Sequence, residues 1–410
     1  MIHVCYGLFD GDGKYSKWTG TSILSMFENS SAPPQSVTVH ILHDTTLTKK
    51  NYENFIYIAG QYRQKIEFHN IENIYPDKFN FLSENLRKVF TSRFSAGTFY
   101  RLMMEKKLFK TENVSKIIYL DSDTVVNLDI AELWKYSMDN YTIAAVPEIQ
   151  ATNGYMIKNK YLLNTEKVKA DDYFCAGVLI INLDRIDENF FYESVKWLAE
   201  NPKCECFDQD ILNYFFSKEY LKLPEKFNSF TDESKFNDTN MVSRKIYHYA
   251  GEAALGFDMQ NANNKLFFSY FIKTPWFNEN TLVNMFETAK KFYGEAKELA
   301  IVYSSISSGK KRVFFMSANF IETIKQIFDI NETEKIIVEE ESNSISDLIK
   351  LLKTSRTKNI FFIISDNFAD IRDKLENAGF AEGQDFLDGT LFLSDKHGIS
   401  IDKWSFLKNM

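Results

Sequence analysis

Residues 116–129 read KIIYLDSDTVVNLD, and this stretch decides the fold and the candidate site. Four consecutive apolar residues, 117–120, predict a strand that is buried on both faces of a parallel sheet. Asp121 and Asp123 follow, and residues two apart in an extended chain point to the same side. Both carboxylates therefore leave the carboxyl end of a core strand, where open α/β sheets bind ligands. Because two like charges this close are unfavourable without a cation between them, the pair predicts a divalent metal site.

The Asp-x-Asp pattern alone is weak evidence for a metal site, because it is more common in turns and helix caps. It occurs at residues 10–12, 121–123 and 208–210. The first lies in a Gly-rich turn that is either a plain connection or a nucleotide-contacting loop. The third is predicted to cap a helix at 211–216, since Asp is favoured there. Only the second follows a predicted buried strand, and that context favours the metal site.

The composition indicates a globular protein and excludes some functions. A chain of 410 residues is long enough for two domains, and a hydrophobic fraction of 44% can fill a substantial core. The net charge of -8 argues against a nucleic-acid partner bound by phosphate neutralisation. No apolar run approaches the ~18 residues of a membrane span, so we expect no transmembrane segment.

The cysteines and the N-terminus predict a cytoplasmic protein. Cys5, Cys175, Cys204 and Cys206 match no zinc-binding spacing, and we expect them to be reduced thiols. The first residues, MIHVCYGLF, lack a basic segment followed by a long apolar one. They predict a first strand and not a signal peptide.

The order of predicted elements places the chain in the α/β class. Strands are expected at 3–9, 37–42 and 66–70, with helices at 22–27 and 49–59 between them. This alternation is typical of βαβ units and of a mainly parallel sheet. The later elements are expected to be a helix at 95–107, a helix starting at 129, strands at 142–146 and 174–183, and a short strand at 246–251.

The C-terminal part predicts a second, smaller domain. Apolar residues at helical spacing indicate a helix over 281–303. From 312 onward strands and helices alternate again, which predicts a small doubly wound α/β add-on domain without a phosphate-binding glycine pattern. The expected organisation is therefore 1–280, a helical linker at 281–308, and 309–410.

Five segments of this chain resemble family 8 glycosyltransferases, and they occur in the same order. They are Arg101, YLDSDTVV at 119–126, YFCAGVLIINL at 173–183, DQDILN at 208–213 and HYAG at 248–251. The resemblance covers about residues 1–277. It implies a GT-A fold, which is Rossmann-like with a mainly parallel mixed sheet, and transfer from a UDP-sugar with Mn2+ and with retention of anomeric configuration.

The resemblance also implies roles for individual residues. Asp121, Asp123 and His248 correspond to the metal ligands; His248 taken alone is more often a satisfied core histidine. Carboxylates and imidazole suit Mn2+, which would stabilise the charge on the leaving UDP. The residues expected to contact the UDP-sugar are Asp10, Asp12, Tyr15, Arg101, Asp121, Ser122, Asp123, Cys175, Asp208, Gln209, His248 and Gly251. Asp12 and Tyr15 resemble the uridine-contacting turn of the family, with Asp10 as the alternative to Asp12.

Three of these residues are expected to act on the sugar. By resemblance, Arg101 and Asp208 hold the hydroxyls of the donor sugar, and Gln209 lies on the β face of the anomeric carbon. An amide is a poor nucleophile, so we expect front-face attack through an ion-pair-like transition state, with Gln209 positioning charge. Glu148 aligns with an acidic position that binds the acceptor.

The chain departs from the family pattern at two places. Cys175 stands where relatives usually carry Asn. After HYAG, residues 252–257 read EAALGF where relatives continue with Lys-Pro-Trp, so the lysine expected to contact the diphosphate is absent. Lys-Thr-Pro-Trp at 273–276 resembles a later closing motif of the family.

These features leave more than one function open. The C-terminal appendage is similar to that of bacterial enzymes that elongate glycans on serine-rich adhesins, which suggests UDP-galactose or UDP-glucose as donor and a protein-linked glycan as acceptor. The leading hypothesis is a metal-dependent hexosyltransferase. The alternatives are a catalytically weak UDP-sugar-binding or scaffold protein, supported by the two departures, and a nucleotidyltransferase, which would release pyrophosphate.

Overall fold

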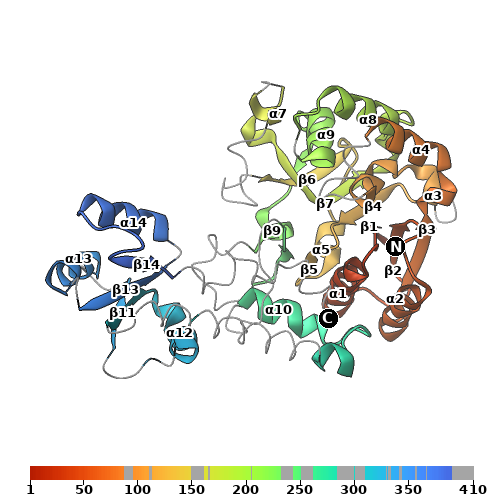
Figure 1. Ribbon diagram of the computed structural model, residues 1–410. Helices are drawn as coiled ribbons and strands as arrows, with labels where there is room; N and C mark the ends of the chain where they lie inside the picture. Colours follow the sequence, from red (N-terminus) through yellow and green to blue (C-terminus); the bar gives the residue numbers. More distant parts are fainter. Residues whose placement is uncertain are drawn as a thin grey trace. The chain divides into compact units, whose positions relative to one another are not determined.

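The computed structural model contains two compact units, Met1–Thr281 and Leu282–Met410 (Figure 1). The residues that the structure describes are 1–86, 96–109, 113–148, 161–164, 167–204, 206–231, 243–250, 262–283, 300, 310–328, 330, 334–340, 344–355, 358–365 and 367–389. The expected helix at 281–303 and the linker at 281–308 therefore lie almost entirely outside the described residues.

The first unit is built on a seven-stranded mixed sheet with the order β3-β2-β1-β4-β7-β6-β8. Neighbouring strands from β3 to β4 are parallel, as are β6 and β8, whereas β7 is antiparallel to both β4 and β6. The predicted Rossmann-like, mainly parallel mixed sheet is confirmed. The strands are β1 Ile2–Leu8, β2 Val37–His43, β3 Lys65–Asn70, β4 Lys116–Leu120, β6 Ile143–Pro147, β7 Phe174–Asn182 and β8 Leu221–Lys222.

A second, three-stranded sheet brings distant segments to the end of β4. Its strands are β5 Thr124–Val126, β9 Ser229–Phe230 and β10 Ile246–His248, in the order β5-β10-β9. β10 runs antiparallel to β5, and this register sets His248 opposite Thr124. The backbone N–H of Tyr249 also donates to the carbonyl of Asp123 at 2.8 Å. The predicted strand at 246–251 is thus three residues long, and its pairing places its end beside the acidic turn.

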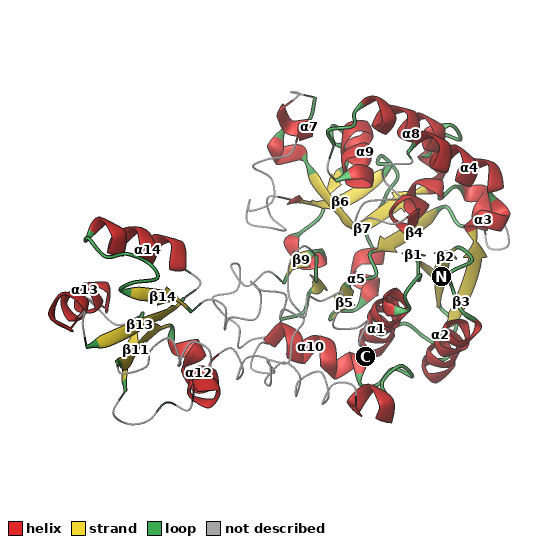
Figure 2. Ribbon diagram, viewed as in Figure 1, coloured by secondary structure: helices red, strands yellow, loops and turns green. Residues whose placement is uncertain are grey.

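Helices cover both faces of the large sheet (Figure 2). On one side α4, α8 and α9 pack over the sheet, and their apolar residues share a core with those of β4 and β7. On the other side lie α1, α2 and α10. The α-helices in the described residues of this unit are α1 Lys14–Asn29, α2 Lys49–Tyr62, α3 Ile71–Ile74, α4 Pro76–Asn85, α5 Ile130–Trp134, α7 Tyr161–Asn164, α8 Phe190–Glu200, α9 Phe207–Phe216 and α10 Ala262–Phe271.

Two predicted helices differ from the structure in ways that have physical causes. The segment carrying Arg101 is not an α-helix; it forms two 3₁₀ segments, Ala96–Met103 and Lys106–Phe109, consistent with the use of 3₁₀ turns as connectors. Helix α9 begins at Phe207, so Asp208 lies in its first turn and not at its cap. Acidic residues in the first turn still stabilise this end of the helix, because their negative charge interacts favourably with the positive end of the helix dipole.

The second unit is the small α/β add-on domain that was predicted. Its four parallel strands have the order β12-β11-β13-β14. One core cluster joins α12 to Phe314 and Phe362, and another joins α13 and α14 to Phe315 and Phe361. Since successive strand residues alternate between faces, helices cover both faces of this sheet. The elements are β11 Lys311–Met316, α12 Ile321–Phe328, β12 Lys335–Val338, α13 Ser344–Ser355, β13 Asn359–Ile364, α14 Phe368–Asn377 and β14 Phe386–Asp388.

Among the described residues, no helix is both long and apolar enough to cross a membrane. Cys5, Cys175 and Cys204 are buried free cysteines, and Cys206 is a half-buried one.

Two helical glycines test how the first unit is packed. In α1, a Cβ on Gly20 would lie 2.1 Å from the indole of Trp276, whereas a Cβ on Gly60 in α2 would meet nothing within 4 Å. We expect Gly20→Ala to lower the free energy of unfolding by about 1–3 kcal/mol through overpacking. Gly60→Ala should leave it unchanged or raise it by up to about 1 kcal/mol, because alanine favours the helix. Equal effects in urea unfolding would contradict the contact between α1 and the segment at Trp276.

Candidate functional site

The acidic turn after β4 brings together the three donor atoms expected for a metal. His248 Nε2 lies 3.3 Å from Asp123 Oδ1 and 3.8 Å from Asp121 Oδ2. The backbone N–H of Asp121 donates to the carbonyl of Gly177 at 2.8 Å, which fixes the turn against β7. Carboxylate oxygens and an imidazole nitrogen, all within 4.8 Å of one another, suit a first-row divalent cation.

The His248 ring is oriented by residues behind it. Its Nδ1 lies 3.0 Å from Asn228 Oδ1 and 4.0 Å from Cys175 Sγ. We assign the proton to Nδ1, which donates to Asn228 and leaves Nε2 facing the carboxylates, the arrangement common in metal-binding histidines. Burial opposes a charge on the ring, but the Asp123 carboxylate raises the pKa of His248 to about 10. The carboxylates thus favour positive charge at Nε2, which is supplied by a proton on Nε2 or by a metal ion that replaces it.

Gly177 and Asn228 are two site residues that the sequence analysis missed. A Cβ on Gly177 would lie 2.1 Å from His248 Cε1, so only glycine on β7 permits the ring to approach. Asn228 precedes β9 and reaches His248 because β9 and β10 pair. The glycine stands inside the predicted apolar strand, where an isolated glycine is a signal of close approach. Nothing local marks Asn228, since its partner is 20 residues away.

Arg101 joins the acidic turn to α9. Its Nη2 lies 2.5 Å from Asp121 Oδ1, its Nε 3.0 Å from Asp208 Oδ2, and its Nη1 donates to the carbonyl of Ala176 at 2.7 Å. The guanidinium also stacks over the Tyr119 ring, 4.3 Å from its centroid. Since one oxygen of Asp121 contacts Arg101, the other is turned toward His248. The structure therefore brings Arg101 and Asp208 to the predicted metal ligands.

Gln209 and Glu148 meet at the edge of this cluster. The backbone N–H of Ala176 donates to Gln209 Oε1 at 2.9 Å, and Gln209 Nε2 donates to Glu148 Oε2 at 2.5 Å. Both ends of the amide are therefore held, and its orientation follows from these partners. Glu148 is 1% exposed. The sequence placed these two residues in different roles without predicting their contact.

The turn after β1 is organised mainly by Asp10. This carboxylate accepts hydrogen bonds from the backbone N–H and hydroxyl of Ser16 and, at 2.7 Å, from the side chain of Asn51. Asp12 pairs with Lys14 at 3.1 Å. Burial raises the pKa of Tyr15, and the carboxylates of Asp123 and Asp121 raise it further.

The other predicted contact residues have different positions. Ser122 is buried against α1, where its hydroxyl accepts from Thr19 at 2.8 Å. Cys175 lies behind His248. Gly251 and residues 252–257 lie outside the described residues. In the motif at 273–276, Lys273 pairs with Glu28 at 2.5 Å, and Trp276 donates to Asn51 at 2.9 Å, so this motif closes the unit over α1 and α2.

Comparisons with known proteins agree with this geometry. The family model described as Glycosyl transferase family 8 matches residues 8–253. A Haemophilus influenzae protein named "Putative glycosyltransferase" is 29% identical over 256 residues, which cover 60% of this chain and 70% of that protein. General stress protein A of Bacillus subtilis is 24% identical over 211 residues, covering 47% and 70%.

One solved structure supports the fold. The apo structure of the bifunctional glycosyltransferase WbbM matches with a TM-score of 0.51 at 21% identity. The match covers 68% of this chain and 50% of that one. At this identity the likeness concerns the fold alone, and it agrees with the GT-A architecture of the first unit.

The burial of Asp208 predicts a pH-dependent stability difference. Burial raises the pKa of Asp208 to about 7, although the Arg101 guanidinium favours the charged carboxylate. In the unfolded chain an Asp has a pKa of about 3.9. Between these values the native state holds a proton that the unfolded state has lost, so this group lowers the free energy of unfolding as pH rises from about 4 to about 7.

We therefore compare Asp208→Asn with the wild type in urea unfolding at about pH 5 and about pH 8. Relative to the wild type, the variant should have a higher free energy of unfolding at about pH 8 than at about pH 5, because only the wild type loses stability as Asp208 ionises. Asp139→Asn, a change of an exposed carboxylate, is the control and should show a much smaller shift. A difference for Asp208→Asn that does not vary with pH, or that shifts the other way, contradicts the assigned burial.

Proposed function

This chain belongs to glycosyl transferase family 8 and is a glycosyltransferase, and we propose that it is a metal-dependent, retaining hexosyltransferase. It moves galactose or glucose from a UDP-sugar to a glycan acceptor. The single observation that carries the proposal is the convergence of Asp121, Asp123 and His248 at the carboxyl end of β4, where α/β sheets bind ligands.

In this proposal Asp121, Asp123 and His248 hold Mn2+. When bound, the ion acts as a Lewis acid that neutralises charge on the diphosphate leaving group. The contact of Asn228 with the far nitrogen of His248 supports this role, because it presents the other ring nitrogen to the carboxylates. Asp12 and Tyr15 contact the uridine, and Asp10 shapes the turn that carries them. Gly251 and Cys175 are assigned to the donor site by resemblance alone.

Arg101 and Asp208 position the donor sugar. Their ion pair is buried, so both side chains have fixed orientations, and a fixed donor or acceptor binds a hydroxyl at little entropic cost. Arg101 also offsets the charge of Asp121, which keeps the carboxylates together before a cation binds. Ser122 supports the turn from behind through Thr19.

Gln209 positions charge and does not form a bond to the sugar. The carbonyl oxygen of its amide accepts from the backbone N–H of Ala176, and the amide nitrogen donates to Glu148. These two contacts fix the orientation of the amide. The acceptor hydroxyl attacks on the face from which UDP departs: the new C–O bond forms as the sugar–phosphate bond breaks, and the hydroxyl proton passes to the leaving diphosphate. Glu148, which accepts a hydrogen bond from Gln209, binds the acceptor.

This mechanism predicts no covalent intermediate on the protein. Mass spectrometry of the enzyme quenched during turnover should show an unmodified chain. A sugar adduct on Gln209 or Asp208 would contradict front-face transfer, since it would require double displacement. Gln209→Ala should retain UDP binding and lower the transfer rate, which separates positioning of charge from binding.

The donor and the metal are tested by release of UDP. UDP-galactose, UDP-glucose and other UDP-sugars are supplied with Mn2+ or with EDTA. We expect metal-dependent UDP release from one donor, and a loss of roughly 100-fold or more in Asp123→Ala. Asp139→Ala removes an exposed carboxylate outside the site and should keep the wild-type rate.

The same assay separates the transferase from a catalytically weak UDP-sugar-binding protein. A free glycan and a glycopeptide are added as acceptors, because the proposed acceptor includes a glycan carried on a protein. Turnover with either one supports the hexosyltransferase. If the protein binds UDP but shows no turnover under any of these conditions, the hexosyltransferase proposal is wrong and the UDP-sugar-binding protein takes its place.

A further inference from the structure

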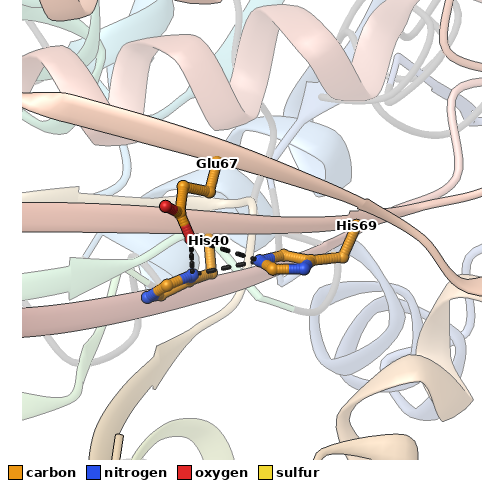
Figure 3. A group of neighbouring side chains, drawn as sticks. All are labelled: His40, Glu67 and His69. Atoms are coloured by element: carbon orange, nitrogen blue, oxygen red, sulfur yellow. Dashed lines mark hydrogen bonds and ion pairs between the residues drawn. The ribbon is translucent and has the colours of Figure 1, made fainter. Parts of the chain in front are cut away.

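A second cluster of metal-binding side chains lies on β2 and β3, away from the acidic turn (Figure 3). His40 stands in the middle of β2, and Glu67 and His69 stand on the edge strand β3. In the parallel register His40 is opposite Glu67, and His69 is two residues further along the same strand. Residues paired or spaced in this way project from one face of a sheet, so the three side chains meet there.

The three donor atoms are spaced like three corners of a tetrahedral metal site. His40 Nδ1 lies 3.0 Å from His69 Nε2 and 3.4 Å from Glu67 Oε2, and His69 Nε2 lies 4.0 Å from that oxygen. In a tetrahedral zinc site with bonds of about 2.0–2.1 Å, neighbouring donor atoms are about 3.3 Å apart. The measured separations bracket this value, so only small side-chain movements would bring all three atoms to one ion.

The contacts around the cluster fix the orientation of each donor. His3 Nδ1 lies 3.1 Å from His40 Nε2, which can therefore donate its proton away from the cluster and leave Nδ1 as the ligand. Lys65 holds the other oxygen of Glu67 at 2.5 Å. The Phe109 ring packs edge-on against both His40 and His69, with centroids 4.8 and 5.4 Å away.

Burial leaves one side of the cluster accessible. His40 is fully buried, whereas the side chains of His69 and Glu67 are 12% and 21% exposed. This partial exposure would let an ion approach from the side of β3, and zinc sites with three protein ligands take water as the fourth ligand.

We propose that His40 Nδ1, His69 Nε2 and Glu67 Oε2 form a Zn2+ site that clamps the edge strand β3 to β2. Two imidazoles and one carboxylate favour zinc, whereas an oxygen-rich set would favour manganese or magnesium. Because the ion would bind the native state only, it would stabilise the sheet edge by mass action. The site is independent of the donor-sugar site, which lies at the end of β4.

The test uses metal-free full-length protein titrated with Zn2+ and, as a spectroscopic probe, with Co2+. We expect Zn2+ to raise the Tm and Co2+ to give the visible absorption of a tetrahedral complex. Both effects should persist in Asp123→Ala, which removes a ligand of the other site. His69→Gln should weaken Zn2+ binding by roughly 100-fold or more and lose the Co2+ spectrum, while UDP release is kept.

Two further variants keep the result interpretable. His43→Gln removes another histidine of β2, whose Nδ1 contacts the backbone carbonyl of Asp44, and should bind Zn2+ like the wild type. Glu67→Gln keeps the shape of the side chain and should also lose the tetrahedral spectrum. Unchanged Zn2+ affinity in His69→Gln and Glu67→Gln would overturn the site, as would binding that is lost in Asp123→Ala alone. His3, His40 and His69 would then form a hydrogen-bonded chain of imidazoles.

Discussion

The charge balance at the end of β4 is the constraint on which the first unit depends. Asp121, Asp123 and Asp208 converge there. Arg101 contacts Asp121 and Asp208. His248 faces Oδ2 of Asp121 and Oδ1 of Asp123. Removing one partner of a buried ion pair typically costs about 3–5 kcal/mol, because the remaining charge is left uncompensated. Arg101 therefore balances the charges of Asp121 and Asp208. The oxygens of Asp121 and Asp123 that face His248 favour a positive charge beside them.

The two sheets of the first unit meet at this cluster, and that meeting sets its geometry. The antiparallel pairing of β10 with β5 carries His248 to the turn, and the missing side chain of Gly177 leaves room for its ring. Asn228 then fixes the ring from behind. A site built from the ends of several strands is precise because backbone pairing, and not loop conformation, places its donors.

Much of the fold and part of the site could be predicted from local sequence. The alternation of strands and helices predicted both α/β units, and the buried strand before Asp121 and Asp123 distinguished this Asp-x-Asp from the other two. Local patterns could not show that the Arg101 segment forms 3₁₀ turns, because packing against the sheet overrides propensity. They also could not find Asn228, or the meeting of His40 with His69, which depend on pairing between distant strands.

In the proposed mechanism, the acidic turn and His248 hold the cation that binds a nucleotide diphosphate. The most direct measurement is anomalous diffraction at the manganese edge from crystals grown with Mn2+ and UDP. We expect one strong peak within bonding distance of Asp121, Asp123 and His248, with the diphosphate on its open side. UDP bound at the end of β4 without such a peak, or a manganese peak away from these three residues, would contradict it.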